Sequence, residues 1–414
     1  MEINVHLGGR PGINCGGFCE FCFYRNTDLS KLNSLKLGCA YCPPDQIGCD
    51  YCRNSVTRIE NKFKPLQQVI TEFGNNLMLL NLSKKLNYDN LRITISGGAD
   101  AFYYPQLTEL VKILNKAGTA IHLGYVSGKG IKNIKQAQDL VDLKIDEVSF
   151  SIFSTNPNLR KKWMHDENPH KPIESLKMFC ENCIVNASAV VIPGVNDEEQ
   201  IIKTGEDLEK WGAETFILRL FANYKYQGLI LNGDKPLIKE IKPFTYEEFQ
   251  ELVGRVSREF SFKVYGLPYY DPDNDSPFAI IKNRNKKYLE KLPLIKSEAT
   301  IITGKLAFPY LKKIFNIIDK SGKINVISVR KEIADLITWE DLMEIDTDEL
   351  KTNIIIPAGA LVHNLQVLNM FGQDKNIKRG PYVLTNHSSQ VDKETFLLNE
   401  YNSLKELIDI INLD

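Results

Sequence analysis

Cys15-Gly-Gly-Phe-Cys19-Glu-Phe-Cys22 is the stretch on which the interpretation of this 414-residue chain depends. It follows a short apolar strand predicted at residues 3–7. Iron–sulfur clusters normally take four cysteine ligands, so three thiolates can hold a four-iron cluster only if one iron stays open to another ligand. A zinc site that these three cysteines share with a later cysteine is the alternative.

The same stretch resembles the cluster loop of the radical S-adenosylmethionine (SAM) enzymes, and Phe21, before the third cysteine, is by this resemblance a predicted SAM contact. The resemblance implies a 4Fe-4S cluster on Cys15, Cys19 and Cys22 whose open iron binds the amino and carboxylate groups of SAM. It also implies reductive cleavage of SAM to methionine and a 5'-deoxyadenosyl radical. In such enzymes the cofactors supply the radical chemistry and the protein positions them.

Four further cysteines form two Cys-x-x-Cys pairs, Cys39 with Cys42 and Cys49 with Cys52. Seven of the nine cysteines therefore lie within residues 15–52, which indicates metal binding rather than a disulfide scaffold. Two such pairs can enclose one tetrahedral ion, either zinc or a single iron. Because protein would fill all four positions, we expect this ion to have a structural or tuning role.

The composition predicts a soluble globular protein of two or three domains, with 43% hydrophobic and 25% charged residues. A net charge of −1 gives no basic surface for nucleic acid or for an anionic membrane. No apolar run is long enough to cross a bilayer, and no signal-peptide pattern is visible. We therefore predict a cytoplasmic protein without nucleic-acid or membrane partners.

From residue 64 onward, apolar strands alternate with amphipathic helices, a pattern typical of βα units and a parallel sheet. Besides the strand near the start, the predicted strands are 91–95, 120–124, 147–152, 187–192, 215–220 and 262–265. One predicted helix, 104–116, carries leucines and a valine at three- and four-residue spacing. The predicted fold class is α/β, a partial (β/α)6 barrel that works at the carboxyl ends of its strands.

Three regions are expected along the chain. Residues 1–57 contain the first strand, the cluster loop and the four-cysteine loop, residues 58–292 form the partial barrel, and residues 293–414 form a small α/β domain. In this last region, the predicted strands are 299–303, 323–329 and 353–356.

Strand ends of the barrel supply the candidate SAM contacts. Ser96-Gly97-Gly98-Ala99-Asp100 resembles the Gly-Gly-Glu motif that holds the SAM amino group, with Asp100 replacing the usual glutamate. The two glycines allow close approach of the backbone to a ligand. Ser151 is predicted to contact the ribose or a carboxylate. By resemblance to a frequent turn of radical SAM barrels, the backbone around Ile192 is predicted to meet adenine.

Several segments together are similar to the methanogenesis marker protein ten family over essentially the whole chain. They are the cluster loop, the two cysteine pairs, and residues 122–130, 221–231 and 299–304. The resemblance implies a cobalamin-dependent radical SAM enzyme that methylates an arginine carbon in the α subunit of methyl-coenzyme M reductase of a methanogenic archaeon. It favours iron in the four-cysteine site. The implied partners are that subunit, or a peptide segment of it, and an electron-donor protein.

Cobalamin is also consistent with the chemistry. An arginine side-chain CH2 has no acidic proton and no lone pair, so it must become a radical before it accepts a methyl group, which methylcobalamin can deliver. By resemblance, residues 293–414 form the cobalamin domain. Leu336 and Ile337 are predicted to form its apolar lower face, with ordinary core packing as the alternative. His363 is the rival axial ligand.

Recognition of an arginine substrate requires a carboxylate, because the guanidinium presents its donors in a fork that matches two oxygens. Asp166, in the acidic loop 163–167, is the predicted clamp. His122 and Lys129, at the strand ends, are interpreted as a hydrogen-bonded rim residue and a solvated amine.

Two rival functions stay open from the sequence. The first is a radical SAM enzyme that modifies another protein or a small molecule without cobalamin. The second is a double zinc-knuckle module that binds RNA, but this leaves the barrel unexplained and lacks the expected basic surface.

Overall fold

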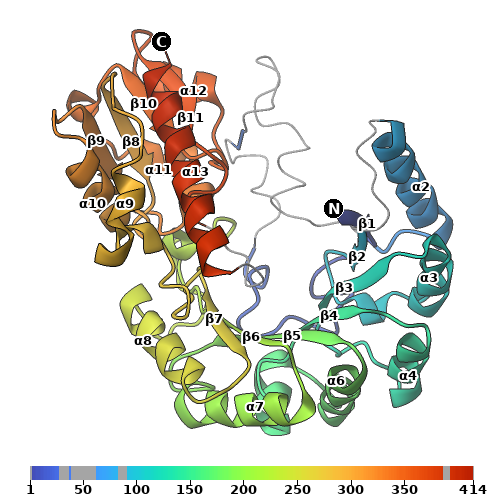
Figure 1. Cartoon of the computed structure of the whole chain (residues 1–414). Coiled ribbons are helices and arrows are strands. Elements are labelled where there is room, and N and C mark those ends of the chain that lie inside the picture. The colour runs from blue at the N-terminus through green and yellow to red at the C-terminus, as the bar shows by residue number, and fades with distance from the viewer. Residues whose placement is uncertain (1, 28–36, 39–61, 83–90, 386–391, 414) are drawn as a thin grey trace. The chain divides into compact units, whose positions relative to one another are not determined.

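Two parallel β-sheets organise the chain, one in each of two structural units (Figure 1). Among the residues that the structure describes, packing assigns 2–26, 62–82, 91–221 and 237–267 to unit 1, and 27, 37–38, 222–236, 268–385 and 392–413 to unit 2. The computed structural model describes residues 2–27, 37–38, 62–82, 91–385 and 392–413. The four-cysteine site, Cys39, Cys42, Cys49 and Cys52, lies outside the described residues.

Unit 1 is built from strand–helix pairs that follow one another along the chain. Its seven strands lie in the order β1-β2-β3-β4-β5-β6-β7, and neighbouring strands are parallel. They are β1 (Glu2–His6), β2 (Arg92–Ser96), β3 (Ala120–Val126), β4 (Glu147–Ser151), β5 (Ile184–Val191), β6 (Thr215–Leu220) and β7 (Lys263–Leu267). The main connecting helices are α2 (Leu66–Leu82), α3 (Leu107–Leu114), α4 (Ile134–Asp142), α6 (His170–Asn182), α7 (Glu198–Trp211) and α8 (Tyr246–Ser257). The predicted partial (β/α)6 barrel is confirmed, with β7 at the end of the series.

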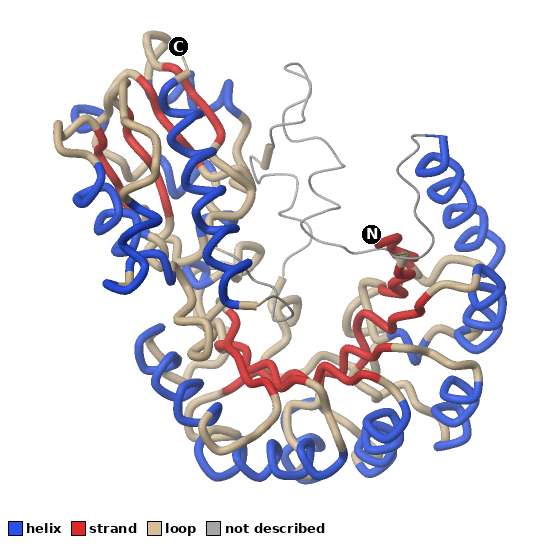
Figure 2. Tube along the Cα trace, in the orientation of Figure 1, coloured by secondary structure: helices blue, strands red, loops and turns tan. Residues whose placement is uncertain are grey.

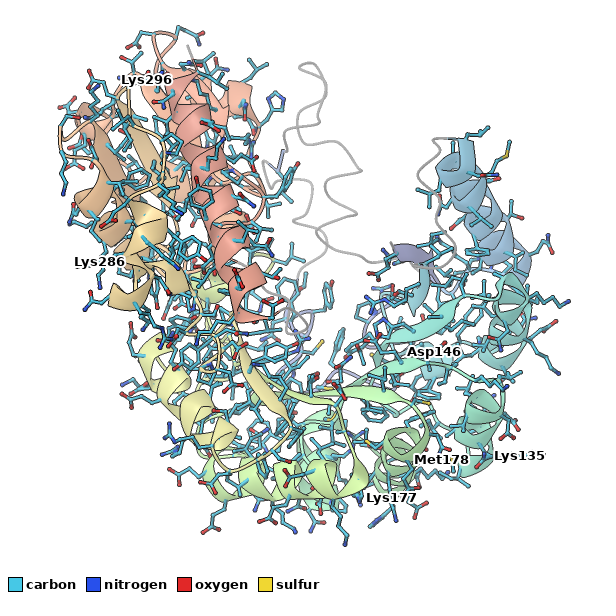
Figure 3. The ribbon with its side chains drawn as sticks, in the orientation of Figure 1. Lys135, Asp146, Lys177, Met178, Lys286 and Lys296 are labelled. Atoms are coloured by element: carbon cyan, nitrogen blue, oxygen red, sulfur yellow. The ribbon has the colours of Figure 1, made fainter. Side chains whose placement is uncertain are left out.

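Alternate residues of these strands face the helices. Ile93 of β2 and Val148 of β4 are fully buried, as expected for strands with one apolar face. Figure 2 shows the helices of unit 1 along the outer side of its curved sheet. Lys135 on α4 and Lys177 on α6 mark this outer layer in Figure 3. We call the other side of the sheet the inner face.

Polar side chains on the inner face bond to one another across the sheet. Arg92 donates to the carboxylates of Glu2 (3.1 Å) and Glu147 (2.8 Å). Glu147 also accepts from Asn186 Nδ2 (2.7 Å), and the side-chain oxygen Oδ1 of Asn186 accepts from Thr215 Oγ1 (2.6 Å). This hydrogen-bonded chain runs from β1 to β6 near the amino ends of the strands, so the charged groups there already have partners.

Two element boundaries differ from the predicted ones for local reasons. β5 begins three residues before the predicted position because its first residue, Ile184, pairs with the start of β4. The predicted helix 104–116 is shorter as α3, because separate 3-10 turns flank it. Asp100 caps the turn before α3, and Gly118, with φ of +65°, ends the turn after it.

Unit 2 contains a four-stranded parallel sheet in the order β11-β10-β8-β9. Its strands are β8 (Ala299–Thr303), β9 (Ile324–Ser328), β10 (Asn353–Ile356) and β11 (Asn376–Arg379). Its longer helices are α10 (Phe308–Ile318), α12 (Asn364–Phe371) and α13 (Lys393–Asn412). The predicted strands 299–303 and 353–356 are confirmed, whereas β11 and α13 were not predicted.

The core of unit 2 is mainly aliphatic, with Phe371 as its aromatic member. Ile337, Ile354 and Val362 are fully buried within one cluster that also includes Leu342 and Val367. No helix among the described residues is long and apolar enough to cross a membrane.

Truncation of Ile354 to alanine should lower the free energy of unfolding by about 2–5 kcal/mol, because it removes buried methyl groups and leaves a cavity. The matched control is Leu398→Ala on α13, a residue that is 49% exposed. Urea unfolding followed by circular dichroism measures both. Equal stabilities of the two variants would contradict the assignment of Ile354 to the core.

Candidate active site at the cysteine loop

The loop that follows β1 carries Cys15, Cys19 and Cys22, so the three thiols lie at the carboxyl end of the first barrel strand. The backbone N–H of Gly12 donates to Cys15 Sγ at 3.0 Å. Gly16 has φ of +65°, and an added Cβ would lie 2.1 Å from the Tyr103 hydroxyl oxygen. Glycine is therefore required there both by conformation and by space.

The electrostatics indicate that the three thiols lie close together. Burial, with a smaller contribution from the neighbouring cysteines, raises the pKa of Cys19 to about 11 and that of Cys22 to about 12. The positive charge of Lys129 acts to lower the pKa of all three thiols. Its ammonium group donates to the Gly17 carbonyl at 3.0 Å, so this amine lies at the cysteine loop rather than in open solvent.

The donor set fits an iron–sulfur cluster. Thiols with raised pKa values stay protonated at neutral pH unless positive iron compensates the charge of the thiolates. No three His, Cys, Asp or Glu side chains among the described residues surround the position of a single ion. In a four-iron cluster, three cysteines bind three different irons, so their sulfurs need not converge on one point.

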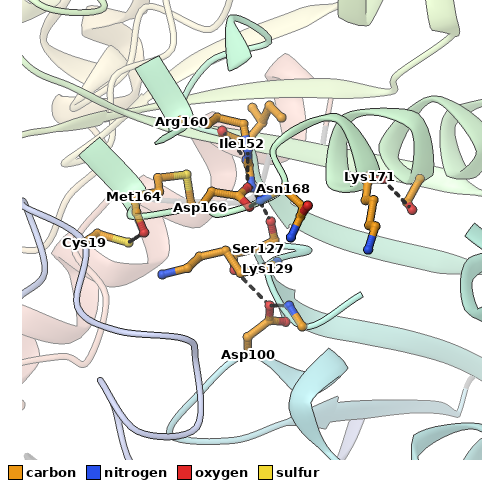
Figure 4. A network of polar contacts seen from close by, with 12 residues as sticks. Cys19, Asp100, Ser127, Lys129, Ile152, Arg160, Met164, Asp166, Asn168 and Lys171 are labelled. Carbon is orange, nitrogen blue, oxygen red and sulfur yellow. Dashed lines mark hydrogen bonds and ion pairs between the residues drawn. The ribbon is translucent and has the colours of Figure 1, made fainter. Parts of the chain in front are cut away.

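A second loop, after β4, holds the cysteine loop in place (Figure 4). The Cys19 thiol contacts the Met164 carbonyl at 3.8 Å. The backbone N–H of Glu20 donates to the Trp163 carbonyl at 2.8 Å, and the Glu20 carboxylate lies 2.7 Å from His165 Nε2. His165 adopts a left-handed φ of +53°, which turns the chain sharply after Met164.

Aromatic stacking adds a further contact between these loops. The ring of Phe21 stacks on Phe153, with centroids 4.8 Å apart and planes at 16°. Trp163 packs against the same Phe153 ring at 6.5 Å. One face of Phe21, a predicted SAM contact, is therefore engaged within the protein, and its contact with SAM stays a prediction.

Arg160 is the fully buried centre of this second loop. It donates to Asp166 Oδ2 from Nε (3.0 Å) and Nη2 (2.7 Å), to the Ile152 carbonyl (2.7 Å) and to the Ser127 carbonyl (2.9 Å). Figure 4 shows these bonds converging from the ends of β3 and β4. Arg160 thus joins two strand ends to the loop that contacts Cys19.

The guanidinium that Asp166 binds in the structure is that of Arg160. Its second oxygen, Oδ1, accepts from the backbone N–H of Asn168 at 3.2 Å, and the residue is only 3% exposed. Both carboxylate oxygens are therefore occupied from within the chain. A substrate guanidinium at this carboxylate would compete with Arg160, and the predicted role of Asp166 as a substrate clamp stays untested.

Asp100 is also fully buried and has several donors. It accepts from the Ser127 hydroxyl (2.9 Å) and from the backbone N–H groups of Gly130 (3.2 Å) and Phe102 (3.1 Å). Burial raises the pKa of Asp100, and these hydrogen bonds oppose the shift. The carboxylate connects the ends of β2 and β3, while its predicted contact with the SAM amino group stays untested.

The remaining predicted SAM residues lie at neighbouring strand ends. An added Cβ on Gly97 would lie 2.6 Å from the Gly8 carbonyl oxygen, and the Gly98 N–H donates to the same oxygen at 3.0 Å. Ser151 ends β4. The Ile192 N–H, after β5, donates to the side chain of Asn196 at 2.8 Å. All four are on the edge of the sheet that also carries the cysteine loop.

His122 is a buried member of the inner face. Its ring lies 3.2 Å from Thr94 Oγ1 and 2.9 Å from Ser149 Oγ, and burial lowers its pKa. The hydrogen-bonded character predicted for His122 is confirmed, but it lies within the sheet rather than at its rim.

The predicted cobalamin residues lie in unit 2. Ile337 is fully buried in the aliphatic core, whereas Leu336 is half-buried and lies next to Gly228. His363 caps α12, with its Nδ1 accepting from the Leu365 N–H at 3.1 Å. Core packing thus accounts for the burial of Ile337, and helix capping accounts for one ring nitrogen of His363. The predicted contacts of these residues with cobalamin stay untested.

A cavity of about 530 Å³ lies at the other end of the barrel. Asp146, Cys180 and Cys183, near the amino ends of β4 and β5, contribute to its lining. Burial raises the pKa of Cys180 to about 12 and that of Cys183 to about 11, so these thiols are protonated and unreactive at neutral pH.

Comparison with known proteins assigns part of unit 1. Residues 118–215 match the family described as the radical SAM-like domain, a stretch that is less than half of the chain. No curated protein sequence matches the chain. The matched stretch runs from just before β3 to the first residue of β6.

Solved structures with detectable similarity are distant from this chain. SuiB from Streptococcus suis is 15% identical, with 67% of this chain and 51% of that chain covered and a TM-score of 0.41. A radical SAM methyltransferase from Sphaerobacter thermophilus is 16% identical, with coverage of 54% and 61% and a TM-score of 0.33. The methyltransferase TsrM from Kitasatospora setae, solved with cobalamin and a 4Fe-4S cluster, is 12% identical, with coverage of 44% and 32% and a TM-score of 0.29. The chain spans about half the length of the SuiB chain.

Replacement of Arg160 by methionine should lower the free energy of unfolding by about 3–5 kcal/mol, because Asp166 would remain buried without its cation. The double variant Arg160→Met/Asp166→Leu should recover a large part of that loss, since it removes both charges. Chemical denaturation measures each variant, with Lys203→Met on the exposed surface of α7 as the control. If the double variant is no more stable than Arg160→Met, the unpaired carboxylate is not the cause of the loss.

Proposed function

We propose that this chain is a radical SAM enzyme whose cluster is held by Cys15, Cys19 and Cys22. The observation that carries the proposal is the position of these thiols at the carboxyl end of β1, in a barrel that contains a radical SAM-like domain. Active sites of such barrels lie at the carboxyl ends of the strands. When bound, the cluster would supply the electron that cleaves SAM.

The loops around the cysteines support this function by what they do in the chain itself. Arg160 and Asp166 join the loop after β4 to the strand ends, and that loop contacts Cys19 through the Met164 carbonyl. Lys129 provides a positive charge beside the thiolates, which would carry negative charge as ligands. The site therefore combines a fixed loop geometry with a nearby cation.

We further propose the specific reaction implied by the resemblance, which is methylation of an arginine carbon in the α subunit of methyl-coenzyme M reductase. Methylcobalamin would be the methyl donor and a separate protein the electron donor. The motifs quoted in the sequence support this proposal, as does the chemistry of an unactivated CH2 group. A surface-exposed or still unfolded segment of the reductase subunit is the expected form of the substrate.

The topology of unit 2 supports a cofactor-binding role for it. In the order β11-β10-β8-β9, the chain passes from β8 to β9 on one side and then to β10 on the other side of β8. In open parallel sheets, ligands bind outside the carboxyl ends of the strands at such a switch point. The turns after β8 and β10, with Gly304 and Pro357-Ala358-Gly359, lie at this position.

Anaerobic purification of protein expressed with cobalamin should give about five irons, four sulfides and one cobalt per chain, if the four-cysteine site holds iron. Cys15→Ala should lose about four irons and all of the sulfide while retaining cobalt. The control Cys180→Ala, on α6, should leave the metal content unchanged. Retention of the sulfide in Cys15→Ala would contradict the ligand assignment, and wild-type protein without cobalt would favour an enzyme that works without cobalamin.

Incubation of the reduced holoenzyme with SAM and a reductase peptide containing the target arginine should add one methyl group to a carbon of that arginine. Tandem mass spectrometry locates the methyl group, and a peptide with lysine at the target position is the control. Because the reaction proposed here starts by hydrogen abstraction, 5'-deoxyadenosine should form in step with the methylated peptide. Formation of 5'-deoxyadenosine without any methylated arginine peptide would retain the radical SAM enzyme but exclude this substrate.

A further inference from the structure

Charged side chains near the amino ends of the inner-face strands pair with one another. Arg92 is bound by the carboxylates of Glu2 and Glu147, at 3.1 and 2.8 Å. His122 lies 3.7 Å from Glu147. These groups neutralise each other within the sheet and leave no free charge for a ligand.

Arg219 differs from these residues. It lies near the carboxyl end of β6. Alternate residues of a strand share a face, so Arg219 lies on the same side of the sheet as Thr215, four residues earlier. Its neighbours in the adjacent strands are the apolar residues Val190 and Leu267. The side chain is exposed, and within the described part of the chain it has neither a hydrogen bond nor an ion pair with an acidic residue.

The topology of the barrel locates Arg219 relative to the candidate active site. Arg219 is the next-to-last residue of β6, and the cysteine loop follows the carboxyl end of β1. Because neighbouring strands of this sheet are parallel, their carboxyl ends lie at the same edge. The guanidinium therefore lies at the edge of the sheet that carries the cysteines. The electrostatic effect of Tyr125, near the end of β3, on the pKa of Arg219 agrees with this position.

We propose that Arg219 is the carboxylate-binding residue of this site, an inference that rests on the proposed function. An exposed guanidinium in apolar surroundings offers a fork of donors that matches the two oxygens of a carboxylate, and lysine lacks this geometry. Two reactants of the proposed reaction carry a carboxylate. One is the methionyl carboxylate of SAM, and the other is an acidic side chain or terminus of the substrate peptide.

The test measures equilibrium binding, without reductant, to the anaerobically prepared holoenzyme. The variants are Arg219→Gln and Arg219→Lys, with Arg255→Gln on the exposed surface of α8 as the matched control. The ligands are SAM, decarboxylated SAM and the arginine-containing reductase peptide. Arg219→Gln should weaken binding of one carboxylate ligand at least tenfold, with a smaller loss in Arg219→Lys and none in Arg255→Gln.

The pattern of losses identifies the source of the carboxylate. Weaker binding of SAM, with unchanged binding of decarboxylated SAM, assigns Arg219 to the cofactor. Weaker binding of the peptide alone assigns it to the substrate. Unchanged binding of both ligands in Arg219→Gln overturns the inference while the proposed function stands. Wild-type holoenzyme that binds no SAM overturns the proposed function, and the inference with it.

Discussion

The buried ion pair between Arg160 and Asp166 is the interaction on which the geometry of the cysteine loop depends. A charge buried without a partner is strongly unfavourable, so the guanidinium and the carboxylate constrain each other. Arg160 uses its remaining donors on two backbone carbonyls, those of Ser127 and Ile152. One side chain thereby fixes three separate backbone segments, and the segment that contains Met164 contacts the cysteine loop directly.

The barrel around this pair could be predicted from the sequence because its strands are governed by burial. Each strand needs one apolar face toward the helices, and residues such as Val148 and Phe150 reveal this alternation. The close backbone approach at Gly97 could also be predicted from the Gly-Gly pair, whereas the roles of the three cysteines and of Gly97 toward cofactors stay predictions. In unit 2, β11 could not be predicted, because its sequence Asn376-Ile377-Lys378-Arg379 has a single apolar residue and depends on pairing with β10.

The roles of individual polar residues were harder to predict. Arg160 begins the run Arg160-Lys161-Lys162, which has the pattern of a solvated surface, yet its side chain is fully buried. Asp166 is predicted from the sequence as a clamp for a substrate guanidinium, whereas the guanidinium that it binds in the structure is that of Arg160. The pairing of these two residues, six positions apart across a turn, cannot be read from composition. Lys129 was interpreted as a solvated amine, and its bond to the Gly17 carbonyl arises from contact between loops 112 residues apart. Arg219 gave no signal at all, because a single arginine at a strand end is unremarkable without knowledge of what surrounds it.

The chain of unit 1 is interrupted by a segment of unit 2. Residues 222–236 belong to unit 2, although the segments on both sides of them belong to unit 1. Within unit 2, the Tyr226 carbonyl accepts from the Glu332 N–H at 2.9 Å, and the Lys225 carbonyl accepts from the buried ammonium of Lys331 at 3.2 Å. A fragment that began at residue 268 would lack both acceptors and would leave that ammonium with fewer partners. The C-terminal unit is therefore not complete in the contiguous sequence 268–414, and dissection of this protein into independently expressed halves would need to include the inserted segment.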